Sequence, residues 1–214
     1  MKVFRKALLA TLIMASASNV FAADTADLTV TGVIKPVACT PSFVGGGNVD
    51  FGNISPTKLS STSHTKLGLR SVNYTITCDA PIAMATRFVD ARAGTGWTTG
   101  ADKLSFGLGK SGKGWIGGYI LQQKNNDLLV DGKAASIIHS GDKGASWVAD
   151  GDVNHVIDGS TLVSFAPSGT LIPGAYKTVA GKLQLETMIA PTSQLDLSSD
   201  IRLDGLATME VVYL

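Results

Sequence analysis

The feature that most constrains the fold of this chain is an alternation of apolar and polar side chains with a period of two residues. The clearest run is Val72–Cys78, in which Val72, Tyr74, Ile76 and Cys78 alternate with polar residues. Successive side chains of a β-strand point to opposite faces, so this period is typical of a strand with one buried face. The same alternation recurs in Leu28–Thr31, Val49–Phe51, Lys182–Glu186 and Ala207–Val211.

Turn sequences rich in glycine, asparagine and aspartate separate these runs. Such residues tolerate the positive φ angles of tight turns. The turn sequences are Gly45–Asn48, Asp131-Gly132, Asp150–Asp152 and Asp158-Gly159. No segment combines helical apolar spacing with helix caps. Many short strands at close spacing predict an all-β protein, an antiparallel β-sandwich.

Composition excludes several classes of protein. The chain has 214 residues, of which 44% are hydrophobic and 16% charged, with a formal net charge of +1. Disorder needs low hydrophobicity and high net charge, so we expect one folded domain. Nucleic-acid binding needs clustered Lys and Arg to neutralise phosphates, and no such cluster follows the N-terminus. We therefore expect no nucleic-acid partner.

The glycine-rich stretch Gly107–Gly114 has a spacing close to that of a phosphate-binding loop. That loop requires Ser or Thr after the lysine, whereas position 114 is glycine. A helix should follow to direct its N-terminus at the phosphates, but Trp115–Leu121 has strand character. We therefore interpret this stretch as a hairpin loop and expect no nucleotide partner.

The N-terminus has the pattern of a secretory signal peptide. Met1–Lys6 is cationic, and Ala7–Ala17 is apolar but short for a bilayer span. Small residues then predict cleavage after Ala22, which removes residues 1–22. Cleavage after Ala23 and retention as an uncleaved anchor are the alternatives. We expect an exported chain.

Export favours a disulfide between Cys39 and Cys78, the two cysteines of the chain. An intermolecular bond is the alternative. Neither cysteine has an adjacent residue that would activate a thiol. We therefore expect the pair to be structural.

Motifs of catalysis and metal binding are absent from the sequence. His64, His139 and His155 are isolated, and no paired-cysteine, H-x-x-x-H or regular calcium-loop spacing occurs. No serine lies in G-x-S-x-G. We expect a protein that is not an enzyme and that uses no cofactor and no metal.

Six segments together resemble, in order, the subunits of chaperone–usher fimbriae, the pilins. The first leads to Pro36 and Cys39, the third delivers the second cysteine, and the last carries a penultimate tyrosine. The segments are Leu28–Ile34, Val49–Ile54, Val72–Cys78, Trp115–Leu121, Ile172–Tyr176 and Ala207–Leu214. The extra glycine-rich and polar material matches a less characterised fimbrial-like branch of the family.

The resemblance implies an immunoglobulin-like antiparallel β-sandwich, spanning residues 23–214, that lacks its last strand. Residues 23–36 would be a donor strand that completes a neighbouring subunit by β-augmentation. The donor face would be Leu28, Val30, Gly32 and Ile34, with Gly32 suited to a shallow pocket. The edge of the accepting groove would be Ala207, Met209, Val211 and Tyr213.

The implied function is that of a structural subunit of a bacterial surface fimbria. Its partners would be a periplasmic chaperone, an outer-membrane usher and neighbouring subunits, and it would pass through the periplasm to the cell surface. Five residues, Ala23–Asp27, precede Leu28, which leaves open whether the strand serves its own domain or a neighbour. The alternative is a self-contained periplasmic or secreted β-sandwich that binds a ligand, with Trp97, Trp115 or Trp147 stacking on a carbohydrate.

Overall fold

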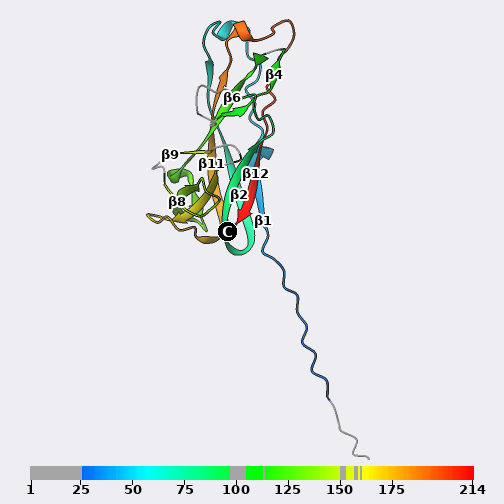
Figure 1. The fold of residues 1–214 in the computed structure, drawn as a ribbon, viewed down its shortest axis with the longest axis vertical. Coiled ribbons are helices and arrows are strands. Elements are labelled where there is room, and N and C mark those ends of the chain that lie inside the picture. Colours follow the sequence, from blue (N-terminus) through cyan, green and yellow to red (C-terminus); the bar gives the residue numbers. More distant parts are fainter. Residues whose placement is uncertain (1–25, 97–104, 113, 150–152, 157–158, 160) are drawn as a thin grey trace, which may run out of the picture. The chain divides into compact units, whose positions relative to one another are not determined.

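The computed structural model describes residues 26–96, 105–112, 114–149, 153–156, 159 and 161–214. These residues form twelve β-strands and four short 3-10 helices, which confirms the all-β prediction (Figure 1). The strands are β1 (Cys39–Phe43), β2 (Thr65–Asp90), β3 (Ser105–Gly107), β4 (Lys110–Ser111), β5 (Gly114–Trp115), β6 (Gly117–Lys124), β7 (Leu129–Val130), β8 (Lys133–Ser140), β9 (Val153–Val156), β10 (Leu162–Pro167), β11 (Ala175–Ile189) and β12 (Ala207–Tyr213). The 3-10 helices are η1 (Val44–Gly47), η2 (Pro56–Lys58), η3 (Asn125–Asp127) and η4 (Thr192–Gln194). Within the described part of the chain, no helix is long and apolar enough to cross a membrane.

The chain divides into two compact units, Met1–Lys35 and Pro36–Leu214. The expected signal peptide, residues 1–22, lies outside the described residues. Residues 26–35 of the first unit have no regular secondary structure. The alternation in Leu28–Thr31 predicts a strand, and that prediction is wrong for the single chain. A strand needs a partner for its backbone N–H and C=O groups, and no described strand pairs with this segment.

The long strand β2 organises the second unit, because it pairs first in one sheet and then in the other. Residues 65–83 pair with β11, and residues 74–78 pair with β1 along the opposite edge. The register against β11 jumps at residues 78–81, which form a bulge and bend the strand. Residues 84–90 then pair with β12. One continuous strand therefore joins the two parts of the fold.

The remaining strands pair antiparallel and join the two sheets, because β7 pairs with both β11 and β8. The successive pairings of β2, β10, β8, β7 and β11 return to β2 and close a five-stranded ring. β11 pairs with β6 and β7, and β6 pairs in turn with β3 and β9. β10 pairs with β8 and with β2. The two-residue turn between β7 and β8 is Asp131-Gly132, with φ values of 46° and 76°. Both angles are positive, as the predicted tight turn requires.

The glycine-rich stretch forms the hairpin that the sequence predicts. Lys110 of β4 pairs with Trp115 of β5, and Ser111 pairs with Gly114. No helix follows, because the chain continues directly into β6. This geometry differs from that of a phosphate-binding loop, which places a helix N-terminus at the phosphates.

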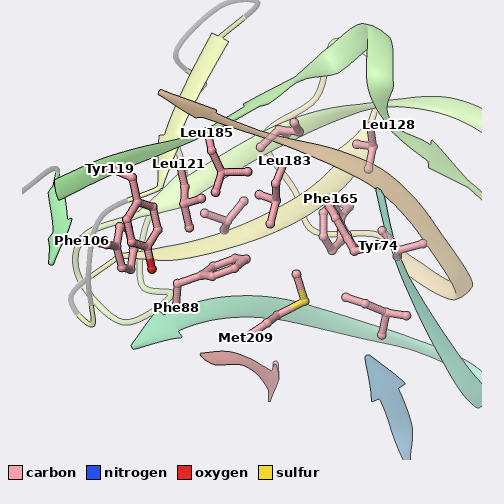
Figure 2. Packing of buried hydrophobic residues seen from close by; sticks show 14 of the residues in the cluster. Tyr74, Phe88, Phe106, Tyr119, Leu121, Leu128, Phe165, Leu183, Leu185 and Met209 are labelled. Carbon is pink, nitrogen blue, oxygen red and sulfur yellow. The ribbon is translucent and has the colours of Figure 1, made fainter. Parts of the chain in front are cut away.

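The apolar side chains of both sheets meet in one core (Figure 2). Phe88 of β2 and Met209 of β12 point toward Leu183 and Leu185 of β11. The rings of Phe106 and Tyr119 stack with centroids 5.4 Å apart. Tyr74 is also buried, and its hydroxyl donates a 2.8 Å hydrogen bond to Oε1 of Gln123. Burial raises the pKa of this hydroxyl above its ordinary value.

The predicted disulfide between Cys39 and Cys78 is confirmed as an intrachain bond. The two residues lie directly opposite each other in the register of β1 and β2. Among the described residues there is no free cysteine. The bond therefore fixes the start of β1 to the part of β2 where the strand bends.

Replacing Cys39 and Cys78 together by alanine should lower the free energy of unfolding. The cysteines are separated by 39 positions, and opening a loop of that size in the unfolded chain costs about 4 kcal/mol of stability in the chain-entropy model. Denaturant unfolding of the variant and of the oxidised and reduced wild type measures the loss. A reduced wild type as stable as the oxidised protein would contradict this expectation.

Candidate functional site

Strand β12 is paired along one edge. Its residues pair with residues 84–90 of β2. The hydrogen bonds from Ala91 N–H to the Leu206 carbonyl and from Leu214 N–H to the Ala83 carbonyl extend this contact at both ends. No described strand pairs with the other edge of β12. The last strand therefore has backbone donors and acceptors available on that side.

Strand β1 lies beside β12 but forms no ladder with it. β1 pairs with β2 alone among the described strands, and it contacts β12 (Figure 1, blue and red). We call this boundary between β1 and β12 the seam. At one end of the seam, the Cys39 N–H donates a 2.8 Å hydrogen bond to the hydroxyl of Tyr213. A side chain, rather than a β-ladder, joins the two strands there.

At the other end of the seam lies a groove with a volume of about 1150 Å³. Phe43, the last residue of β1, and Ala207, the first residue of β12, both line it. Its walls are two segments without strand structure, residues 44–59 and 195–206. Its floor consists of core side chains: Val72, Phe88, Leu121, Leu183, Leu185 and Ile189. The groove therefore leads directly to the hydrophobic core.

The walls are apolar where they approach the floor. Residues 44–59 contribute Val49 and Phe51, and their alternation predicts a strand that the structure does not contain. The prediction is wrong because no described strand supplies the backbone partners that this segment would need. The guanidinium of Arg70 lies 5.1 Å from the Phe51 ring centroid, a cation–π contact on the flank of this wall.

The second wall was not foreseen from the sequence. The residues concerned are Leu195, Leu197, Ile201 and Leu203. A partial signal for them exists, because these four residues occupy odd-numbered positions, as do the apolar residues of β12. Gly205 and Ser199 interrupt the alternation, so it divides into two short pairs upstream of β12.

An ion pair anchors this second wall. Nε and Nη2 of Arg92 donate to the two carboxylate oxygens of Asp204, at 2.8 Å and 3.0 Å. The guanidinium holds the pKa of the Asp204 carboxyl below its ordinary value. The Asp204 N–H also donates to the Leu108 carbonyl at 3.1 Å. The chain is thus held in place just before β12 begins.

The rim of the groove is polar and carries both signs of charge. Asp50, Asp200 and Arg202 lie there. The Asp50 carboxylate accepts a 2.8 Å hydrogen bond from the Gly52 N–H. In the described part of the chain, no group of three or more His, Cys, Asp or Glu side chains is arranged to hold a metal ion. An apolar groove with a polar rim is suited to bind an apolar segment.

The predicted edge residues occupy different places. Ala207 lines the groove, Met209 is buried in the core and Val211 packs against the core. Tyr213 is 47% exposed at the far end of the seam. The structure therefore brings one of the four, Ala207, into the groove lining, because alternate side chains of β12 point into the core beneath it.

The predicted donor residues belong to the first unit. Leu28, Val30 and Ile34 are 91%, 89% and 100% exposed. At Gly32 a Cβ atom would meet no other atom within 4 Å.

Trp115 and Trp147, the two tryptophans that the structure describes, do not form one aromatic surface. Trp115 is 47% exposed in the β4–β5 hairpin. Trp147 is partly buried beside Gly144, close to the C-terminal residue Leu214. Figure 1 places β4 and the C-terminus at opposite ends of the second unit. Trp97 lies outside the described residues.

Comparison with known proteins identifies relatives along most of the chain. A family model described as "Protein of unknown function (DUF1120)" matches residues 28–135. The chain is 31% identical to "Uncharacterized protein YhcF" of Escherichia coli (strain K12), over 90% of this chain and 92% of that protein. It is 28% identical to "Protein GltF" of the same strain, over 93% of each.

The anchor before β12 can be tested at Gly205. A Cβ atom there would lie 2.8 Å from Cε1 of Tyr119 and 3.0 Å from Cδ2 of Leu108. We expect Gly205→Ala to lower the free energy of unfolding by about 1–3 kcal/mol, because the wall must shift or the ring must move. Denaturant unfolding measures the change.

Gly141→Ala is the matched control, since a Cβ atom at Gly141 would meet nothing within 4 Å. Its effect should stay within about 0.5 kcal/mol. Equal stability of the two variants would show that the segment before β12 is not held as described.

Proposed function

The chain belongs to the DUF1120 family, and we propose that it is a structural subunit of a bacterial surface fimbria assembled by donor-strand complementation. In this proposal the second unit is an immunoglobulin-like β-sandwich that lacks its last strand. The observation that carries the proposal is the groove that leads to the core beside the unpaired edge of β12.

One added strand would satisfy both requirements of this site. The free edge of β12 needs backbone hydrogen-bond partners, and unprotected edges promote association. Two apolar residues of the groove lining, Leu197 and Leu206, are 46% and 52% exposed, and an added strand would cover them. In β-augmentation, the backbone of an added strand pairs with the edge while alternate side chains fill pockets. The geometry supports a strand as the occupant.

The segment around Leu28–Ile34 has the properties that such a strand needs. Leu28, Val30 and Ile34 are almost fully exposed. They would share one face if the segment became a strand. Burying three such side chains at about 1.5–3 kcal/mol each contributes roughly 5–9 kcal/mol before ordering costs. Gly32 lies between them and would fit a shallow pocket.

Assembly would proceed by successive occupation of the groove. A periplasmic chaperone would fill it after export, which the signal peptide of residues 1–22 would direct. At an outer-membrane usher, the N-terminal segment of the next subunit would replace the chaperone. Such head-to-tail contacts do not close on themselves and so build a filament at the cell surface.

The proposal is tested with a synthetic peptide of residues 24–36. The protein is the chain from residue 23 carrying Ile34→Asp, so that its own arm cannot fill the groove. The peptide should raise the thermal midpoint, because a ligand at 100 times its dissociation constant stabilises the folded state by about 2.7 kcal/mol. Thermal unfolding with increasing peptide gives the affinity.

Adjacent residues of the peptide provide a matched control. Ile34→Asp in the peptide should abolish the stabilisation, because it places a charge on the buried face. Val33→Asp should have little effect, because successive side chains of a strand point to opposite faces. If neither the native peptide nor its variants change the thermal midpoint of the protein, a self-contained binding protein becomes the better explanation. Trp115 and Trp147 lie too far apart to form one carbohydrate-stacking surface in such a protein.

Gly32 supplies a separate prediction. A Gly32→Leu peptide should bind at least about fivefold more weakly, because overfilling a shallow pocket costs at least about 1 kcal/mol. The same titration measures it. Binding equal to that of the native peptide would contradict the shallow-pocket role.

A further inference from the structure

We propose that Tyr213 ends the docking site: its side chain spans the seam to β1, so that a strand added from a second copy of this chain pairs with β12 only on the Ala207 side of Tyr213. This inference rests on the proposed function and adds a boundary to it. It assigns to the penultimate residue a positioning role in the interaction.

The contact that carries the inference joins a side chain to a backbone. The Tyr213 hydroxyl accepts a 2.8 Å hydrogen bond from the Cys39 N–H. In a β-ladder the two backbones would lie about 4.8 Å apart and would pair directly. Here a phenol ring and a hydrogen bond stand between them. The ring occupies the path that an added strand would follow at this end of the seam.

Both partners of this hydrogen bond are fixed to β2, on either side of its bend. Cys39 is bonded to Cys78, and the Asp79 N–H donates to the Ala38 carbonyl at 3.0 Å. Tyr213 pairs with Met84, just beyond the bend. The tyrosine therefore links the two sides of the bend at residues 78–84. It cannot move aside without breaking its hydrogen bond to Cys39 or its pairing with Met84.

The opposite end of the seam has no such closure. Phe43 and Ala207 line the groove there, whereas Cys39 and Tyr213 do not. Upstream of Ala207, four further odd-numbered positions as far as Leu195 are apolar and line the groove, although Gly205 and Ser199 interrupt the alternation. Lengthening the added strand at this end would therefore add contacts with the groove. Lengthening it past Tyr213 would add none.

The occupant to which we commit is the N-terminal segment of a second copy. Its alternating run Leu28–Ile34 spans seven positions, and β12 also has seven residues. Its apolar face is exposed, and the groove is apolar with a polar rim. Length and chemistry therefore agree between the two.

The test compares peptides of different length on two proteins. One protein is the chain from residue 23 with Ile34→Asp, and the other carries Tyr213→Ala as well. The peptides are residues 28–34 and the same peptide with a Val-Thr pair added at either end. Calorimetric titration gives each affinity.

With Tyr213 present, one extension should tighten binding about fivefold, because it adds strand hydrogen bonds and an apolar contact. The other extension should change the affinity less than about twofold. In the Tyr213→Ala protein, both extensions should tighten binding. The peptide terminus whose extension tightens binding only in the Tyr213→Ala protein is the one that lies at Tyr213. This terminus therefore shows the direction in which the added strand runs.

Hydrogen exchange in the free protein tests the contact without any peptide. Tyr213→Phe keeps the ring and removes the acceptor, so exchange of the Cys39 amide should accelerate at least about tenfold. Tyr176→Phe removes a hydroxyl elsewhere in the second unit and should leave this amide unchanged. An unchanged Cys39 amide in Tyr213→Phe would overturn the inference.

The outcomes separate the inference from the function beneath it. Peptides that bind, but whose two extensions act alike in both proteins, overturn the boundary and leave the proposed function standing. A chain that binds none of the peptides, the 24–36 peptide included, overturns the proposed function and the boundary together.

Discussion

The need of every β-strand for backbone hydrogen-bond partners on both edges governs this molecule. β2 meets it along most of its length, with β1 and β11 on one side of its bend and β12 and β10 on the other. β1, at one end of the pairing order, and β12, which branches from β2, do not meet it among the described residues. The disulfide and the groove both lie along the boundary between these two strands.

Much of the fold could be predicted from periodicity, because a half-buried strand has apolar residues on one face and polar residues on the other. The runs around Val72–Cys78, Lys182–Glu186 and Ala207–Val211 all lie in strands. Leu28–Thr31 and Val49–Phe51 show the same pattern without strand structure. Alternation records which side chains can be buried together, but it does not record whether a partner strand is present in the same chain.

The candidate site was predicted less completely. The cysteine pair followed from the expected export and from the count of cysteines. The assignment of Ala207, Met209, Val211 and Tyr213 to the edge of an accepting groove stays a prediction. The sequence analysis did not predict the wall formed by Leu195, Ile201 and Leu203. These residues show part of an alternating pattern, but their segment does not form a strand. The ion pair of Arg92 with Asp204 joins residues 112 positions apart, and no local pattern could reveal it.

Phe88, Leu121 and Leu183 belong at once to the core and to the groove floor. If the proposed function holds, a substitution at any of them would change both the stability of the subunit and the binding of the added strand, because one surface would serve both. Selection on such positions would then act on both properties together. Subunit stability and the strength of its attachment would therefore be inherited as a single trait, and variation in attachment alone would be confined to the rim and to the N-terminal segment.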